Sequence, residues 1–143
     1  MDDVVLRAMA KWPNVPSVFG WLALDRRGHW RLRRERIGNR ATNDFISRNY
    51  TCDEQGRWYF QNGPQRVFVT LDYTPWVFTL DAGAQLRTHT QLPVETLHHC
   101  WIDDGMNLLL ETEHGVGIVH DHDLEPLTEA FHSPDGRKLL DDE

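Results

Sequence analysis

Residues 50–78 read YTCDEQGRWYFQNGPQRVFVTLDYTPWVF, and this segment sets the architecture that we expect for the chain. Three runs rich in aromatic and β-branched residues, at 57–61, 66–71 and 76–80, are separated by turn-forming clusters. In an extended strand Trp58 and Phe60 share one face. The segment therefore predicts a three-stranded antiparallel meander whose aromatic face supplies much of the core.

The turns of this segment carry their own signals. Asn62-Gly63 is typical of a type I′ hairpin turn, because both central positions of that turn require a positive φ. The pattern DxxGxW occurs twice, from Asp25 to Trp30 and from Asp53 to Trp58. It predicts two copies of one hairpin unit, each with its indole buried directly after the turn.

The rest of the chain adds short helices and more hairpins. An apolar stripe over 2–12 predicts an N-terminal helix that Pro13 ends. A second helix is expected over 43–50, capped by Thr42 or Asn43, and a third only after Pro126. Alternating segments bounded by Asp/Gly turns predict strands at 18–24, 29–33, 85–89, 97–102, 106–112 and 116–120.

These elements predict an α+β fold: mainly antiparallel β-sheet of successive hairpins, curled or two-layer, with two or three short helices. We expect one domain over 1–143, with the helix at about 2–12, a β-rich body at about 18–120 and an acidic, mobile tail at about 132–143. No apolar run has the length of a membrane span and no secretory signal begins the sequence, so a cytoplasmic protein is expected. Cys52 and Cys100 are interpreted as reduced thiols.

Charge is distributed unevenly along the chain. The formal net charge is −7, yet residues 100–143 hold 12 acidic and two basic residues, so the first 99 carry +3. Seven arginines between positions 26 and 40 surround one acid, Glu35. This cluster is a surface for a nucleic-acid or other anionic partner, or it faces the acidic tail, or both segments are simply solvated. Nucleic acid is not expected, because the net acidity opposes it.

Catalytic motifs are missing from the sequence. Ser17, Ser47 and Ser133 are the only serines and none lies in GxSxG, and the chain holds no GxxxxGK[ST], GxGxxG or HExxH. No catalytic residue and no cofactor are therefore assigned. Seven of the eight histidines follow residue 88. His120 and His122, on either side of Asp121, are weak metal candidates, and they support a metal-dependent hydrolase as an alternative function.

Polar residues beside the central hairpin form the candidate ligand site. The site comprises Gln61, Asn62, Gln65 and Arg66, with Tyr59 and Trp76 as neighbours. Amide and guanidinium groups on a rigid hairpin can hold a small anionic molecule or a peptide, or they can instead satisfy the backbone around Pro64. The predicted function is a ligand-binding or regulatory module without catalysis. A homo-oligomeric interaction module, built on exposed tryptophans or a sheet edge, is the third alternative.

Two sets of motifs resemble known families. WYFQNGPQRV at 58–67 and TPWV at 74–77, with KWPNVP at 11–16 and Gly20-Trp21-Leu22, resemble a family of small bacterial proteins of unknown function over most of the chain. No activity is known for that family, so no functional residue carries over. The DxxGxW pattern is similar to that of another bacterial family of unknown function with repeated β motifs, for which a signalling role has been suggested.

Overall fold

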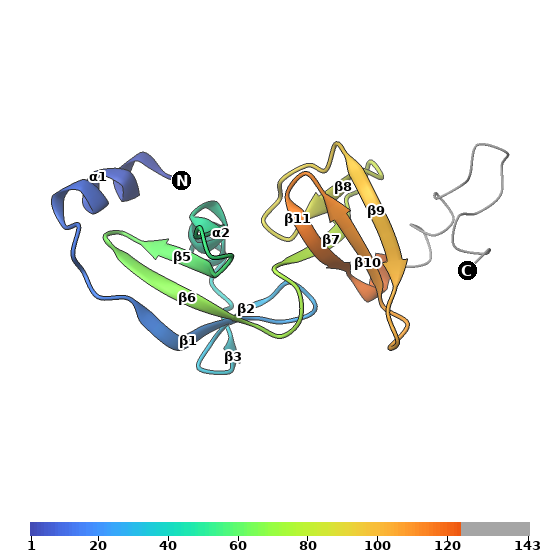
Figure 1. Ribbon diagram of the computed structural model, residues 1–143, viewed down its shortest axis with the longest axis horizontal. Coiled ribbons are helices and arrows are strands. Elements are labelled where there is room, and N and C mark those ends of the chain that lie inside the picture. Colours follow the sequence, from blue (N-terminus) through green and yellow to red (C-terminus); the bar gives the residue numbers. More distant parts are fainter. Residues whose placement is uncertain (124–143) are drawn as a thin grey trace, which may run out of the picture.

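The computed structural model describes residues 1–123, in which two α-helices accompany eleven strands (Figure 1). The elements are α1 Asp3–Lys11, β1 Val18–Leu24, β2 Trp30–Leu32, β3 Glu35–Arg36, α2 Arg40–Arg48, β4 Tyr50–Cys52, β5 Trp58–Asn62, β6 Gln65–Leu71, β7 Trp76–Leu80, β8 Leu86–Thr88, β9 Leu97–Ile102, β10 Leu108–Thr112, β11 Gly115–Val119 and a 3₁₀ turn at Asp121–Asp123. The α+β class is confirmed. The predicted tail and the helix after Pro126 lie outside the described residues.

The strands form two sheets rather than one run of hairpins. The first sheet has the order β3-β2-β1-β6-β5-β4 and the second has β8-β7-β11-β10-β9. Most neighbours are antiparallel, but β1 pairs with β6 and β7 pairs with β11 in parallel. The expectation of successive hairpins therefore holds only in part, because each open sheet contains one parallel pairing between strands distant in sequence.

The predicted three-stranded meander is wrong at its third strand. β5 and β6 form the expected hairpin, with Asn62 paired to Gln65. β7 does not continue it, because the other edge of β6 is already occupied by β1. The segment between β6 and β7 instead carries the chain into the second sheet, where β7 lies between β8 and β11.

The hairpin turn between β5 and β6 also differs from the prediction. Its central residues are Gly63 and Pro64, one position later than expected. Gly63 has φ +57, while proline cannot adopt a positive φ. This combination is the pattern of a type II′ turn, which needs a positive φ only at its first central residue, rather than the predicted type I′ turn.

The two sheets share one topology, apart from β3. In each, a hairpin (β1–β2 or β7–β8) lies in parallel beside the last strand of a three-stranded meander (β4–β5–β6 or β9–β10–β11). The registers match as well: Leu22 pairs with Val69 in the first sheet, and Phe78 pairs with Val119 in the second. The predicted reuse of a hairpin unit is thus part of a larger repeat.

One aspartate turn recurs four times in this repeat. Asp25, Asp53, Asp81 and Asp103 each follow a strand, and the Oδ1 atom of each accepts the backbone N–H groups two and four residues later, at 2.8–3.0 Å. In all four, the backbone N–H of the aspartate donates to the carbonyl four residues on. The aspartate side chain therefore accepts backbone N–H groups that have no partner strand where the chain reverses.

A continuous apolar core joins the sheets. Leu22, Leu24 and Phe60 of the first sheet belong to the same buried cluster as Phe78 and Leu110 of the second. Its aromatic centre lies at the junction, where the ring of Tyr50 packs 4.9 Å from that of Trp30 and 5.3 Å from that of Trp76. Trp30 is buried as predicted, whereas Trp58 is only partly buried.

The helices pack on the first sheet. α1 matches its predicted range, and Val5 is its buried residue. α2 begins earlier than predicted, because the side chain of Asn39 caps it by accepting the backbone N–H of Thr42 at 2.9 Å. Tyr50, expected at the end of this helix, starts β4 instead. The ring of Phe45 packs edge-on against Phe60, which fixes α2 on the core-facing side of the sheet.

Candidate functional site

The candidate site lies on the outer face of the first sheet, the face opposite the core. Alternation along β5 and β6 puts Phe60 and Val67 toward the core and Tyr59, Gln61 and Arg66 on the outer face. The end of α1 and the connector to β1 reach the same place. They enclose a depression of about 300 Å³ that is lined by Met9, Trp12, Pro13, Val15, Ser17, Gln61, Pro64 and Arg66.

Gln61 is buried in this wall with half of its amide unused. Its side chain is 2% exposed, and its amide nitrogen donates to the carbonyl of Gly63 at 3.0 Å. Because that partner is an acceptor, the amide oxygen must point the other way, where Oε1 has no hydrogen-bond partner. A buried acceptor without a donor is costly, so the site favours a group that supplies one.

Arg66 provides an unneutralised cation beside it. Its guanidinium carbon lies 4.0 Å from the centre of the Tyr59 ring, and Tyr59 is buried. Within residues 1–123 the Arg66 side chain makes no hydrogen bond or ion pair. Arg57 stacks similarly on Phe68 at 4.9 Å, but its Nε is bound to Asp53 at 2.7 Å. Stacking therefore fixes the plane of Arg66 and leaves its donors available.

The structure brings together three of the six predicted ligand residues. Gln61, Arg66 and Tyr59 are neighbours on the outer face. Asn62 and Gln65 line a different, mostly apolar groove of about 400 Å³ on the core side, beside α2. Trp76 lies in the second sheet, where its indole N–H donates to the carbonyl of His114 at 2.8 Å. Trp12 and Ser17, which complete the depression, were not among the predicted ligand residues.

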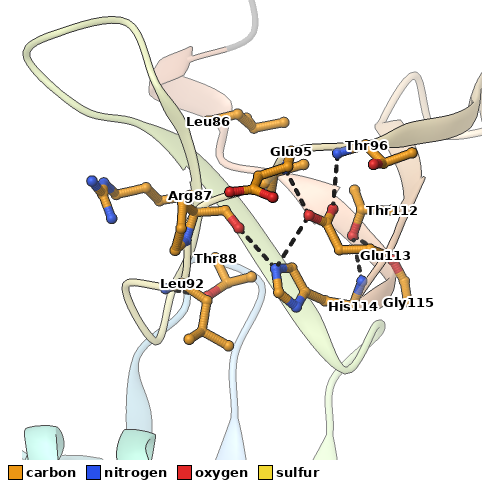
Figure 2. Close-up of polar contacts among 12 residues, drawn as sticks. Leu86, Arg87, Thr88, Leu92, Glu95, Thr96, Thr112, Glu113, His114 and Gly115 are labelled. Carbon is orange, nitrogen blue, oxygen red and sulfur yellow. Dashed lines mark hydrogen bonds and ion pairs between the residues drawn. The ribbon is translucent and has the colours of Figure 1, made fainter.

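Glu113 and His114 form an acid–histidine pair whose hydrogen bonds hold the local structure together (Figure 2). The Glu113 carboxylate accepts the backbone N–H groups of Glu95 and Thr96, at 2.7 and 3.2 Å. Although burial opposes ionisation, these two bonds keep the pKa of Glu113 below its ordinary value. The Nε2 atom of His114 donates to the carbonyl of Pro93 at 2.9 Å. The pair ties the segment before β9 to the β10–β11 turn.

The histidine candidates after β11 lie close together. Ligand atoms of His120, Asp121 and His122 are all within 4.8 Å of one another. The Nδ1 atom of His120 already accepts the backbone N–H of His122 at 3.1 Å, which leaves Nε2 for a ligand. Asp121 also forms an ion pair with Arg27 at 3.1 Å, so a metal would compete with that guanidinium. Neither Cys52 nor Cys100 is in a disulfide.

Comparisons with known proteins identify the class first by fold. The chain is similar to the crystal structure of a DUF1285 family protein from Silicibacter pomeroyi DSS-3, with a TM-score of 0.62 at 15% identity, over 95% of this chain and 88% of that one. It is also similar to a DUF1285 family protein from Shewanella baltica OS155, with a TM-score of 0.57 at 11% identity, over 78% and 93%. At such identities the likeness defines the fold alone: an α+β protein of two mixed sheets.

The family assignment follows from a sequence model. The chain belongs to the DUF2944 family, described as "Protein of unknown function (DUF2946)", whose model matches residues 1–141. This confirms the expectation of an uncharacterised family. No curated protein matches the sequence. No helix within residues 1–123 is long and apolar enough to cross a membrane.

Proposed function

We propose that the protein is a cytoplasmic ligand-binding module without catalysis, and that its ligand occupies the depression beside Gln61 and Arg66. The observation that carries this proposal is the pairing of a buried, unpartnered amide oxygen with a guanidinium that stacks on Tyr59 but has no hydrogen-bond or ion-pair partner within the described residues. Structural residues usually satisfy each other, so two adjacent unsatisfied groups on one wall favour a ligand.

The chemistry of the wall defines the ligand. The guanidinium takes an anionic group. The Gln61 oxygen is covered by protein atoms, so its side chain must turn toward the depression to accept an N–H or O–H donor from the same molecule. Met9, Trp12, Pro13 and Val15 add apolar side chains to the lining, although the depression as a whole exposes more polar than apolar surface. A small carboxylic acid or phosphate ester with a donor group fits these requirements, as does a short acidic peptide.

A thermal-shift screen over such anions, followed by calorimetry on each ligand found, tests the proposal. Arg66→Ala and Gln61→Met should each weaken binding at least tenfold. Arg57→Ala is the matched control, because it removes a stacked arginine from the same face that is already neutralised by Asp53. A ligand whose affinity responds equally to all three variants would contradict this site.

A second candidate function is metal binding at His120, Asp121 and His122, supported by the proximity of their ligand atoms. Elemental analysis of protein purified without a histidine tag would test it. If the site is used, His122→Asn should release the metal and Arg27→Ala should tighten it, because Arg27 competes for Asp121. Absence of stoichiometric metal would remove this candidate and, with it, the metal-dependent hydrolase.

A further inference from the structure

The turn between β2 and β3 has an unusual composition for its backbone. Leu32 pairs with Glu35, so Arg33 and Arg34 are its two central residues. They have φ +50 and +77, the left-handed pair that defines a type I′ turn. Asn and Gly are the residues that normally fill these positions, because a Cβ atom is strained at positive φ, glycine has none, and asparagine offsets the strain with local hydrogen bonds. Two arginines here carry a local conformational cost that asparagine and glycine would avoid.

A tryptophan is placed beside this turn by a second irregularity. The register of β1 against β6 shifts between Val18 and Leu22, where Gly20 adopts φ +78. Trp21, within this bulge, is 48% exposed. The guanidinium carbon of Arg33 lies 3.9 Å from the centre of its ring. The bulge thus supplies an exposed aromatic surface with a cation on it.

The two turn arginines have their donors free. Within the described part of the chain, neither the Arg33 nor the Arg34 side chain forms a hydrogen bond or an ion pair. Arg31, in contrast, is bound to the protein: its Nε donates to Asp25 at 2.9 Å and one terminal nitrogen donates to the carbonyl of Arg34 at 3.0 Å. Arg31 therefore braces the turn, while Arg33 and Arg34 are available to a ligand.

These residues line a depression of about 590 Å³ on the outer face. Ala23 and Thr70, paired across β1 and β6, give it a floor of small side chains. Trp21, Arg31, Arg33 and Arg34 line it together with one carboxylate, Asp72. It shares none of its lining residues with the depression beside Gln61.

The second sheet shows that the fold does not need these cations. There Arg87 repeats the role of Arg31, donating to Asp81 at 2.7 Å and to the carbonyl of Gln91 at 3.0 Å. The segment that it braces contains Thr88, Thr90 and Gln91, and Gln91 has φ +75. The brace is common to both sheets, whereas the free arginines and the exposed indole belong to the first.

We propose that the Arg33–Arg34 turn and Trp21 bind the phosphate and base of a nucleotide. Paired guanidinium donors match phosphate oxygens, and the base would stack on the face of the Trp21 indole that Arg33 does not cover. A free nucleotide and a single strand of nucleic acid share this chemistry. The net charge of −7 opposes a long polyanion, so the free nucleotide is the better ligand of the two.

Calorimetry on the full chain at low salt, with ATP, inorganic phosphate and a twelve-residue oligothymidylate as probes, tests this site. ATP should bind at least tenfold more tightly than phosphate. Arg33→Asn combined with Arg34→Gly should abolish binding yet keep or raise the melting temperature, because these residues suit the turn. Trp21→Ala should weaken ATP but not phosphate, and Asp72→Asn should tighten both.

Arg7→Ala combined with Arg40→Ala is the control, because it removes the same charge from exposed positions outside the depression. ATP affinity within twofold of wild type in this control supports the proposal. Equal loss in the control and in the turn variant would reduce the effect to net charge and overturn the site. Absence of ATP binding at millimolar concentration, or oligothymidylate binding that is indifferent to Arg33 and Arg34, would overturn it as well.

Discussion

The two sheets of this protein solve the same folding problem with different residues. Both use one strand order, and both reverse their strands at aspartates that accept two backbone N–H groups. In the first sheet the left-handed residue of these turns is glycine, Gly28 or Gly56, while in the second it is Ala84 or Met106. The topology therefore depends on the aspartate and on strand alternation. It tolerates a strained, positive-φ residue three positions after the aspartate.

The sheets differ more in what is attached to them. The described helices, α1 and α2, both pack on the first sheet, and its outer face carries stacked arginines, exposed rings and the buried amide of Gln61. In the second sheet, the Glu113–His114 pair is instead used to hold the segment before β9. These unequal additions to a repeated frame are the reason that both proposed ligand sites lie on the first sheet.

The largest change in stability is expected at a strand position where the two sheets carry different residues. Gly117 occupies the place that Val67 has in the first sheet, but an added Cβ would lie 2.5 Å from the Phe78 ring and 2.7 Å from the Trp76 carbonyl. Gly117→Ala should destabilise the fold by about 3 kcal/mol, because the Trp76 backbone cannot move away from the added Cβ atom. Gly38→Ala, with no atom within 4 Å, should change stability by less than about 0.5 kcal/mol. Urea unfolding measures both.

The next effect concerns the junction between the sheets. Burial lowers the pKa of His89 to about 3, and its Nδ1 accepts the backbone N–H of Val77 at 3.1 Å. The unfolded chain therefore takes up this proton at a higher pH than the folded one. Stability should be full above about pH 6.5 and fall by about 1.4 kcal/mol per pH unit as pH decreases toward 3.

Chemical denaturation between pH 7 and 5 checks this dependence before the carboxylates titrate. His89→Asn should flatten the profile by about 2 kcal/mol at pH 5. His29, whose pKa is also lowered by burial, contributes in the same direction, so His29→Asn is measured beside it. A profile left unchanged by His89→Asn would mean that this ring is hydrated in solution.

The third effect compares equivalent turns. Burial opposes ionisation of Asp25, yet bonds from the backbone of His29 and from Arg31 outweigh it and lower its pKa. Its side chain is 11% exposed, against 33% for Asp81. Asp25→Ala should cost about 2 kcal/mol because it leaves two N–H groups without their acceptor, and Asp81→Ala should cost less. If the two variants lower the melting temperature equally, burial of the aspartate does not determine how much each turn contributes to stability.

Much of this frame could be predicted from the sequence, because strand alternation and Asp/Gly turns are local signals. Strand pairing could not, since alternation says which face a residue occupies and nothing about its neighbouring strand. For that reason the sequence does not predict that β7 crosses to the second sheet, or that Trp76 lies there. The separation of Gln61 from Asn62 was predictable from alternation, as successive residues lie on opposite faces. The unpartnered oxygen of Gln61 could not be predicted, because the depression beside this residue is completed by residues 9–17, which are distant in sequence.

The smallest effect tests the glycine difference directly. Met106 has φ +63 and its side chain is 75% exposed, so Met106→Gly relieves backbone strain and gives up little packing. Stability should rise by about 0.5–1 kcal/mol, because the strain relieved slightly exceeds the extra freedom of an unfolded glycine. The reverse change, Gly56→Ala, meets no atom within 4 Å at φ +77 and should cost about 1 kcal/mol through conformation alone. Opposite shifts in melting temperature support one common turn, whereas destabilisation by both would mean that the second sheet holds Met106 through contacts that the first lacks.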